Sequence, residues 1–333
     1  MALSDLPVPL TLAPMEAKLV DVVPEGPGWR YEPKWDGFRC LAFRSGDEVA
    51  LRAKSGKPLD RFFPDVVAAL KALPVDRFVV DGELTIAVGG QPSFEALQMR
   101  LHPAASRVNR LAAEQPAALV LFDDLMDARG RPLLDAPLSE RHAALEALVE
   151  RFGETRAVQL SPGTSERAIA CGWLEDLGVA LDGVIAKRLD GPYVPGERAM
   201  QKIKKIRTAD CVVGGFRYEA DSELVGSLLL GLYDEAGRLN HVGFTSTITN
   251  AERPALTRRL EALKGEGFTG DAPGGPSRWS TERTGEWVAL RPELVVEVRY
   301  DHVTGRRFRH GTKLVRWRPD KSPRQCAFDQ IGR

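Results

Sequence analysis

The segment Glu32-Pro33-Lys34-Trp35-Asp36-Gly37-Phe38-Arg39 is the most distinctive stretch of the sequence. It places a lysine two residues before an Asp-Gly pair, and a lysine becomes a covalent nucleophile when its amine is deprotonated. Keeping a lysine of ordinary pKa neutral at pH 7 costs about 4.6 kcal/mol, a cost that nearby cations reduce. The chain supplies such cations in one basic part of the sequence: Lys187, Lys202, Lys204 and Lys205. An isolated Lys-x-Asp-Gly segment is more often a surface lysine before a turn, so the remaining sequence has to decide.

Composition narrows the class of protein. A chain of 333 residues with 43% hydrophobic and 28% charged residues is typical of roughly two globular domains. Lys plus Arg and Asp plus Glu both number 46, so a nucleic-acid partner has to be held by local basic patches. The four cysteines form no Cys-x-x-Cys pair, which excludes a zinc ribbon. With no basic leader and no long apolar run, we expect a soluble cytoplasmic protein without a membrane partner.

The first two hundred residues mix helical and strand patterns. Apolar runs at 78–80, 119–122 and 184–186 predict buried strands. Two amphipathic helices are expected: one over 138–152, entered at Ser139, and one that Ser165 caps and Gly178 ends.

After Lys205 the pattern changes to closely spaced strands. We expect strands at 211–216, 227–233, 239–244, 293–298 and 314–317, a helix capped by Asn250 that reaches Leu263, and a loop over 265–276. Five strands with one helix suit a small closed β-barrel of the OB type. The expected boundary gives domains 1–206 and 207–333, with the linker near Lys205 to Thr208.

Seven segments, taken in order, resemble the signature segments of the covalent nucleotidyltransferases, and specifically of the ATP-dependent DNA ligases. They are Lys34-Trp35-Asp36-Gly37 with Arg39, Ala53-Lys54-Ser55-Gly56, Asp81-Gly82-Glu83, Leu121-Phe122-Asp123, Asp182-Gly183-Val184-Ile185-Ala186-Lys187, Lys202-Ile203-Lys204 and Arg318-Pro319-Asp320-Lys321. Each is weak alone, but together they cover nearly the whole chain. The segments 207–215 and 316–320 look most like the stand-alone bacterial C-type ligases, and the ligase module of bacterial end-joining proteins is also similar.

The resemblance implies an α+β protein: a nucleotidyltransferase domain with an ATP-grasp-like ligase catalytic core, followed by a C-terminal OB-fold β-barrel. It implies that Lys34 is adenylated by ATP with Mg²⁺ or Mn²⁺, and that Glu83 and Asp182 serve the metal, Glu83 also bonding the ribose. The implied ATP- and AMP-binding residues are Glu32, Lys34, Arg39, Lys54, Glu83, Phe122, Arg198, Lys202 and Lys204. Phe122 would stack on adenine, and Arg318, Asp320 and Lys321 would orient the leaving pyrophosphate.

Two positions depart from the family pattern. Lys54 stands where the family has arginine, so a planar fork for phosphate becomes a point charge, and Arg52 is the alternative carrier. Asp182 replaces a glutamate, which keeps the carboxylate but shortens its reach by one methylene.

Each role has an ordinary structural alternative. Glu83 fits a solvated turn residue, Phe122 a core residue of an apolar strand, and Lys202 with Lys204 an exposed edge strand. Arg198 fits a surface ion pair with Glu197.

The resemblance implies nicked double-stranded DNA as the partner. The stretch 305–324 carries eight lysines and arginines against Asp320 alone, interleaved with apolar residues, which predicts a phosphate-binding strand without base specificity. We expect a monomer acting in DNA repair, with repair or end-joining proteins as further partners. The alternatives are an RNA ligase or capping guanylyltransferase, or a non-catalytic OB-fold protein that binds nucleic acid. NAD⁺-dependent ligation is disfavoured, because ligases of that kind carry further domains for which this chain has no room.

Overall fold

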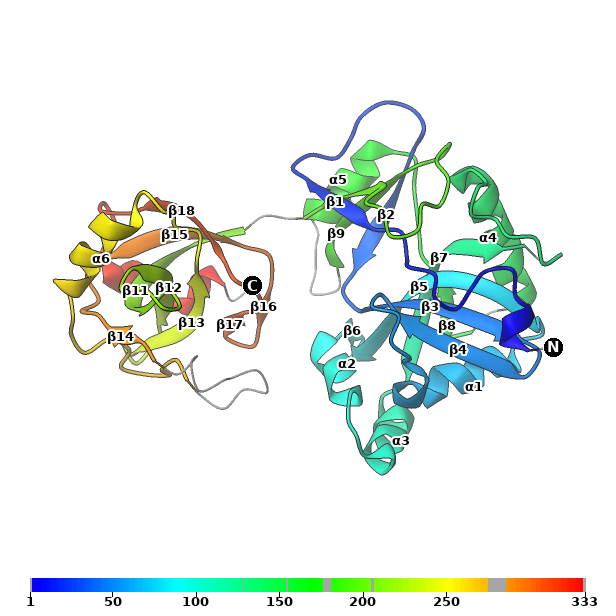
Figure 1. Ribbon diagram of the computed structural model, residues 1–333, viewed down its shortest axis with the longest axis horizontal. Coiled ribbons are helices and arrows are strands. Elements are labelled where there is room, and N and C mark those ends of the chain that lie inside the picture. Colours follow the sequence, from blue (N-terminus) through cyan, green and yellow to red (C-terminus); the bar gives the residue numbers. More distant parts are fainter. Residues whose placement is uncertain are drawn as a thin grey trace. The chain divides into compact units, whose positions relative to one another are not determined.

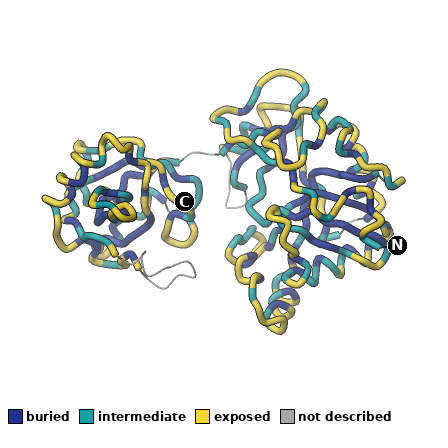
Figure 2. The backbone as a smooth tube through the Cα atoms, in the orientation of Figure 1, coloured by how far each residue is buried: buried dark blue, intermediate teal, exposed yellow. Residues whose placement is uncertain are grey.

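The computed structural model describes residues 2–127, 129–153, 155–175, 181–204, 207–274 and 286–331. The chain divides into two compact units, Met1–Lys205 and Ile206–Arg333. Figure 1 traces both units and Figure 2 shows that each has its own buried interior. No helix in the described part of the chain is long and apolar enough to cross a membrane.

The larger sheet of the first unit has the strand order β4-β3-β5-β7-β8, with the short β6 paired to β5. Its strands are β3 (Phe38–Ser45), β4 (Glu48–Ala53), β5 (Arg77–Val88), β6 (Gln91–Pro92), β7 (Ala117–Met126) and β8 (Val158–Leu160). The helices of this half are α1 (Pro64–Ala72), α2 (Phe94–Arg100), α3 (Ala105–Glu114) and α4 (Leu138–Phe152). One core joins Leu70 of α1 and Leu145 of α4 to Phe78 of β5, because every second strand residue faces the same side.

The smaller sheet of the first unit has the order β1-β10-β9-β2. Its strands are β1 (Ala17–Val20), β2 (Trp29–Trp35), β9 (Leu181–Arg188) and β10 (Met200–Ile203), and α5 (Arg167–Glu175) contacts β2 and β9. Tyr31, Ala170 and Val184 lie in the core between helix and sheet.

A two-residue turn, Asp36-Gly37, links β2 of the smaller sheet to β3 of the larger one. A Cβ at Gly37 would lie 2.1 Å from the carbonyl oxygen of Leu84, so only glycine fits there. Gly183 has φ +144°, and a Cβ there would lie 2.0 Å from the carbonyl oxygen of Ile203. The glycines of two signature segments therefore permit close backbone contacts beside the chemical residues.

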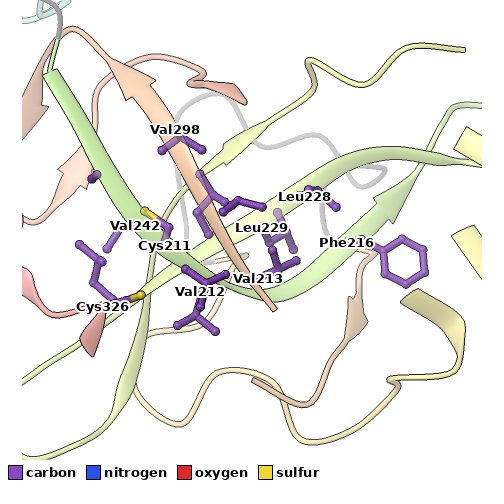
Figure 3. Packing of buried hydrophobic residues seen from close by; sticks show 14 of the residues in the cluster. Cys211, Val212, Val213, Phe216, Leu228, Leu229, Val242, Val298 and Cys326 are labelled. Carbon is purple, nitrogen blue, oxygen red and sulfur yellow. The ribbon is translucent and has the colours of Figure 1, made fainter. Parts of the chain in front are cut away.

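The second unit is built on one sheet with the order β13-β12-β11-β15-β18, with β14 also paired to β11. The strands are β11 (Arg207–Tyr218), β12 (Val225–Tyr233), β13 (Leu239–Thr245), β14 (Val288–Ala289), β15 (Val295–Tyr300) and β18 (Lys313–Trp317), with the hairpin β16 (Val303–Thr304)–β17 (Arg307–Phe308) and helix α6 (Arg253–Glu261). Figure 3 shows the apolar side chains of β11, β12 and β15, among them Val213, Leu229 and Val298, packed together.

The outer strands of this sheet approach each other at one point. Thr245 of β13 forms an isolated bridge with Thr312, next to β18, and its hydroxyl donates to the Thr312 carbonyl oxygen at 3.0 Å. Within the described ranges no continuous ladder joins β13 to β18. Over its described residues the second unit is thus dominated by one antiparallel sheet, and the closed barrel that we expected stays a prediction.

Most expected elements are present, but several ends differ. Helix α5 begins at Arg167, later than the predicted cap at Ser165, and its predicted end, Gly178, lies outside the described residues. Helix α4 is preceded by Pro137 instead of being entered at Ser139. Helix α6 begins at Arg253 with Glu252 as its N-cap, later than the predicted cap Asn250, because Pro254 lacks a backbone N–H and fits only the first turn. The helix ends at Glu261, short of the predicted Leu263.

The linker prediction also needs correction. Arg207 and Thr208 already pair with Tyr300 and Arg299 as the first residues of β11, since an extended strand at the sheet centre satisfies their backbone groups. The other two residues of the predicted linker, Lys205 and Ile206, lie outside the described residues.

Candidate active site

A cavity of about 230 Å³ opens in the first unit, with walls from both sheets and from the chain before β1. We call it the Lys34 cavity. Its lining residues are Pro14, Met15, Glu16, Ala17, Glu32, Pro33, Lys34, Trp35, Arg39, Lys54, Glu83, Phe122, Ile185, Lys187, Met200 and Lys202. Seven of the predicted nucleotide-binding residues are in this set: Glu32, Lys34, Arg39, Lys54, Glu83, Phe122 and Lys202.

Lys34 lies near the end of β2 and faces Asp182 on the adjacent strand β9. Its Nζ donates to Asp182 Oδ2 at 2.6 Å, and Lys204 Nζ lies 3.0 Å from the same oxygen. Burial alone would raise the pKa of Asp182, but the charges of Lys34 and Lys204 outweigh burial and lower it. Asp182 is therefore an ionised carboxylate that holds the amine in place.

Lys187, one of the cations expected to lower the cost of a neutral Lys34, is itself paired with a carboxylate. Lys187 lies 2.7 Å from Glu32 Oε2, both side chains being buried, and donates to the Phe122 carbonyl oxygen at 3.0 Å. Strands β2 and β9 pair Glu32 with Ile185, so Glu32 and Lys187 meet on adjacent strands. Burying these charges requires such a partner.

Phe122 is 8% exposed and lies between two cationic side chains. The Arg39 guanidinium carbon is 4.5 Å from the ring centroid and Lys187 Nζ is 4.7 Å from it. Both distances fall in the range of cation–π contacts. The ring therefore lines the cavity as a flat apolar surface with positive charge next to it.

Arg39 is fixed by a buried network that the sequence did not predict. Its Nε and Nη2 each donate to Asp81 at 2.6 Å, and the Tyr193 hydroxyl donates to Asp81 Oδ2 at 2.6 Å. The Tyr193 oxygen in turn accepts the Met15 N–H at 3.0 Å. The only sequence signal was the position of Asp81 directly before Gly82-Glu83; nothing pointed to Tyr193.

Glu83 lies opposite Arg39 in the β3–β5 pair and lines the cavity. Burial raises the pKa of Glu83 to about 7, although Arg39 and Lys34 oppose the shift. Near neutral pH this carboxyl group is thus present both as hydrogen-bond donor and as acceptor.

The cavity rim carries a cluster around Glu16, a residue that sequence reasoning missed. Lys54 Nζ lies 2.9 Å and Arg198 Nε 4.0 Å from its carboxylate oxygens, and the hydrogen bond with Lys54 lowers the pKa of Glu16 despite some desolvation. Burial, followed by Lys34 and Lys204, lowers the pKa of Lys202. Excess positive charge at this rim suits phosphate groups.

Arg198 and Lys204 lie outside the lining of the Lys34 cavity. The Arg198 side chain is 74% exposed and contacts Glu16 at the rim, whereas Lys204 contacts Asp182. The described residues hold no group of three or more His, Cys, Asp or Glu side chains placed for a metal.

The residues predicted to orient pyrophosphate belong to the second unit: Arg318, Asp320 and Lys321. Arg318 contacts Asp320 at 2.9 Å, and Asp210 of β11 accepts from Arg318 Nη1 at 2.9 Å and from Lys321 Nζ at 2.7 Å. Asp210 was not predicted, because it lies more than one hundred residues earlier in the chain.

Comparison with known proteins places this geometry in context. Residues 12–205 match the family model "ATP dependent DNA ligase domain", and residues 221–321 match "ATP dependent DNA ligase C terminal region". The chain is 46% identical to DNA ligase C2 of Mycolicibacterium smegmatis (98% of this chain, 96% of that protein) and 43% identical to DNA ligase C of Mycobacterium tuberculosis (98% and 96%).

Solved structures agree. The ligase domain of M. tuberculosis LigD is 31% identical, with a TM-score of 0.51 over 96% of this chain and 98% of that one. A Lig E DNA ligase shares the fold at 17% identity, with a TM-score of 0.58 over 91% and 99% of the two chains. By its two family domains, its relatives and its lysine-centred cavity, the chain belongs to the family of ATP-dependent DNA ligases.

Proposed function

We propose that this protein seals nicks in duplex DNA through a covalent Lys34–AMP intermediate. The observation that carries the proposal is the position of Lys34: its amine lies on the wall of the cavity and is held at 2.6 Å by an ionised carboxylate. Since the pKa of Asp182 is lowered, its carboxylate stays ionised and orients the Lys34 amine. The proton that Lys34 loses before it attacks is released to solvent.

In the first step the Lys34 amine attacks the α-phosphate of ATP. The new P–N bond forms as the P–O bond to pyrophosphate breaks. Phosphoryl transfer needs chiefly positioning and neutralisation of charge, which Lys202 and Lys204 supply. Phe122 offers its face to the adenine, and Glu83 a hydrogen bond to the ribose. Glu32, Arg39, Lys54 and Arg198 complete the nucleotide-binding set.

In the second step an oxygen of the DNA 5′-phosphate attacks the phosphorus of lysyl-AMP, and Lys34 leaves as the amine. In the third step the neighbouring 3′-hydroxyl attacks the activated 5′-phosphate, forms the phosphodiester and releases AMP. Arg318, Asp320 and Lys321 act in the first step only, where they orient the departing pyrophosphate.

The donor set fits Mg²⁺, or Mn²⁺, in a limited way. Mg²⁺ is commonly bound through one or two carboxylates together with phosphates and water, and Asp182 supplies one ionised carboxylate. Glu83, with its raised pKa, is better suited to the ribose than to the metal. The ion would neutralise phosphate charge; Lys34 and Lys204 must share Asp182 with it.

The second unit is proposed to be an OB-type barrel that grips DNA. The order 3-2-1-4-5 of its five main strands and the bridge between Thr245 and Thr312 support that architecture. Exposed cations such as Arg316 and Lys313 on β18 would bind phosphates without reading bases. We propose domains of 1–206 and 207–333 and a cytoplasmic monomer that acts in DNA repair, alone or with end-joining proteins.

The test is labelling with [α-³²P]ATP and Mg²⁺, followed by sealing of a nicked duplex. We expect one AMP per chain and sealing by the wild type, and neither by Lys34→Ala. Glu235→Gln, an exposed carboxylate of the second unit, is the matched control that keeps both. Sealing by Lys34→Ala at the wild-type rate would disprove the covalent mechanism. GTP and nicked RNA, run in parallel, separate a DNA ligase from a capping enzyme or an RNA ligase.

A further inference from the structure

Asp210 holds two cations at once, one on each carboxylate oxygen. Arg318 Nη1 donates to Oδ1 at 2.9 Å and Lys321 Nζ donates to Oδ2 at 2.7 Å. The Asp210 side chain is 11% exposed, and those of Arg318 and Lys321 are 18% and 22% exposed. Because the two oxygens belong to one rigid group, the carboxylate sets the separation of the two positive charges.

The backbone of Asp210 is itself fixed by the Gln330 side chain. The Asp210 N–H donates to Gln330 Oε1 at 3.0 Å, and Gln330 Nε2 donates to the Asp210 carbonyl oxygen at 3.1 Å. The backbones of the two cationic residues are fixed as well. The Arg318 N–H donates to the Val295 carbonyl oxygen at 2.8 Å, and the Lys321 N–H donates to the Arg318 carbonyl oxygen at 3.2 Å. Acceptor and donors therefore both extend from fixed backbone.

The arrangement is not one that folding alone favours. The β11–β15 register places Asp210 directly opposite Glu297, and like charges opposite each other destabilise a sheet. Arg318 contacts both carboxylates, Asp210 at 2.9 Å and Glu297 at 4.0 Å, and Arg316 contacts Glu297 at 2.7 Å. Well-packed apolar residues often serve stability as well as a buried ion-pair network does. A role beyond stability explains the charges better.

We infer that Asp210 is a positioning residue for adenylation, which aligns Arg318 and Lys321 for the pyrophosphate before the nucleotide arrives. The inference rests on the proposed function, because it needs those two cations to act in the first step. Long cationic side chains lose rotamer freedom when they grip a phosphate, and a carboxylate behind them removes part of that loss in advance. Asp210 then matters for the first step and not for the third.

The experiment compares two rates in the same preparations of the full chain. One is the rate of label transfer from [α-³²P]ATP at subsaturating ATP; the other is sealing of a nicked duplex that already carries a 5′-adenylate. We expect Asp210→Asn to slow the first rate about tenfold, as expected for the loss of one charge-assisted hydrogen bond, and to leave the second within about twofold. Asp210→Glu should restore part of the first rate.

Asp234→Asn is the matched control, since Asp234 is a carboxylate of the same unit that pairs with Arg238 at 2.9 Å; both rates should stay unchanged. In an Arg318→Ala/Lys321→Ala background, Asp210→Asn should have no further effect on the first rate, because the groups it positions are absent. Equal loss of both rates, or an unchanged first rate, would overturn the inference. If Asp210→Asn fails to fold, as judged by urea unfolding, Asp210→Ser replaces it.

The two proposals fail separately. A wild-type protein that takes up no label contradicts the covalent mechanism, whatever Asp210 does. A wild-type protein that labels and seals normally, beside an Asp210→Asn variant with an unchanged first rate, contradicts the positioning role alone.

Discussion

Asp182 in the first unit and Asp210 in the second unit each bind two cationic side chains, but in different ways. Asp182 and Asp210 are almost equally buried, with side chains 10% and 11% exposed. The shortest contacts of Lys34 and Lys204 both reach one oxygen of Asp182, Oδ2, whereas Arg318 and Lys321 each have an oxygen of Asp210 to themselves.

The two arrangements suit different roles, one for a nucleophile and the other for an anion-binding pair. Two ammonium groups that share one oxygen repel each other, so the contact between Lys34 and Asp182 is one that the nucleophile can give up. Two cations on separate oxygens form a fixed pair that can meet a phosphate as a unit. Similar burial thus gives a releasable amine in the first unit and a rigid anion-binding pair in the second.

The largest expected effect on adenylation comes from removing the negative charge of Asp182, which Lys34 and Lys204 share. Asp182→Asn should slow adenylation about a hundredfold, or about 2.7 kcal/mol, because both lysines lose their partner and Lys34 is no longer held toward the cavity. The initial rate of [α-³²P]ATP labelling measures it. Asp182→Glu, which lengthens the side chain by one methylene, is the control and should keep most of the activity. A loss smaller than that of Asp210→Asn would reverse the comparison.

Asp124 is a buried carboxyl group whose pKa shifts in the direction opposite to that of Asp182. It is 1% exposed, and the described part of the chain gives it no ion pair. Burial raises the pKa of Asp124 to about 8. Since the folded pKa lies above the unfolded value, its contribution to stability is complete below about pH 4 and is lost as pH rises toward 8.

Asp124→Asn removes this titration. Relative to the wild type, the variant should gain about 2 kcal/mol in the free energy of unfolding between pH 5 and pH 6.5, at about 1.4 kcal/mol per pH unit. Urea unfolding at both pH values measures the change, with the exposed Asp47→Asn as control. A constant difference between variant and wild type would show that Asp124 is ionised in the folded protein.

The order of the signature segments anticipated much of the candidate site. Lys34, Glu83 and Phe122 come from different strands yet line one cavity, as the resemblance implied. Local rules also located most strands, because apolar runs such as 119–122 are fully buried.

Pairing across long sequence distances could not be predicted. Lys34 and Asp182 are 148 residues apart, and Arg318 and Asp210 are 108 apart, so only the sheet registers bring them together. Ends of elements were also missed where a single residue decides, as Pro254 does for α6. The approach of the outer strands β13 and β18 in the second unit depends on the isolated bridge between Thr245 and Thr312, which no sequence pattern marks.

A third test concerns positioning within the first unit. Tyr193→Phe removes the hydroxyl that donates to Asp81 and accepts the Met15 N–H, so Arg39 becomes less well held. Losing one such hydrogen bond should cost about 1 kcal/mol, seen as an approximately fivefold rise in the KM for ATP with a smaller change in kcat. Tyr218→Phe, on an exposed hydroxyl of the second unit, is the control. A fall in kcat at unchanged KM would mean that Tyr193 acts on the chemical step instead.

The smallest effect is expected at the rim, where charge is exposed. The Lys54 side chain is 60% exposed and pairs with Glu16 at 2.9 Å. Exposed ion pairs contribute about 0–1 kcal/mol, so Lys54→Arg, which restores the planar fork of the family, should change the adenylation rate by less than about threefold, in the direction of a gain. Lys54→Met, which removes the charge, is the comparison and should lose more. Asp182 and Asp210 fix the positions of half-buried cations, whereas the Lys54 ammonium beside Glu16 remains in contact with solvent. A loss of more than tenfold in Lys54→Arg would contradict this difference, because it would show that the rim also requires a lysine in one fixed position.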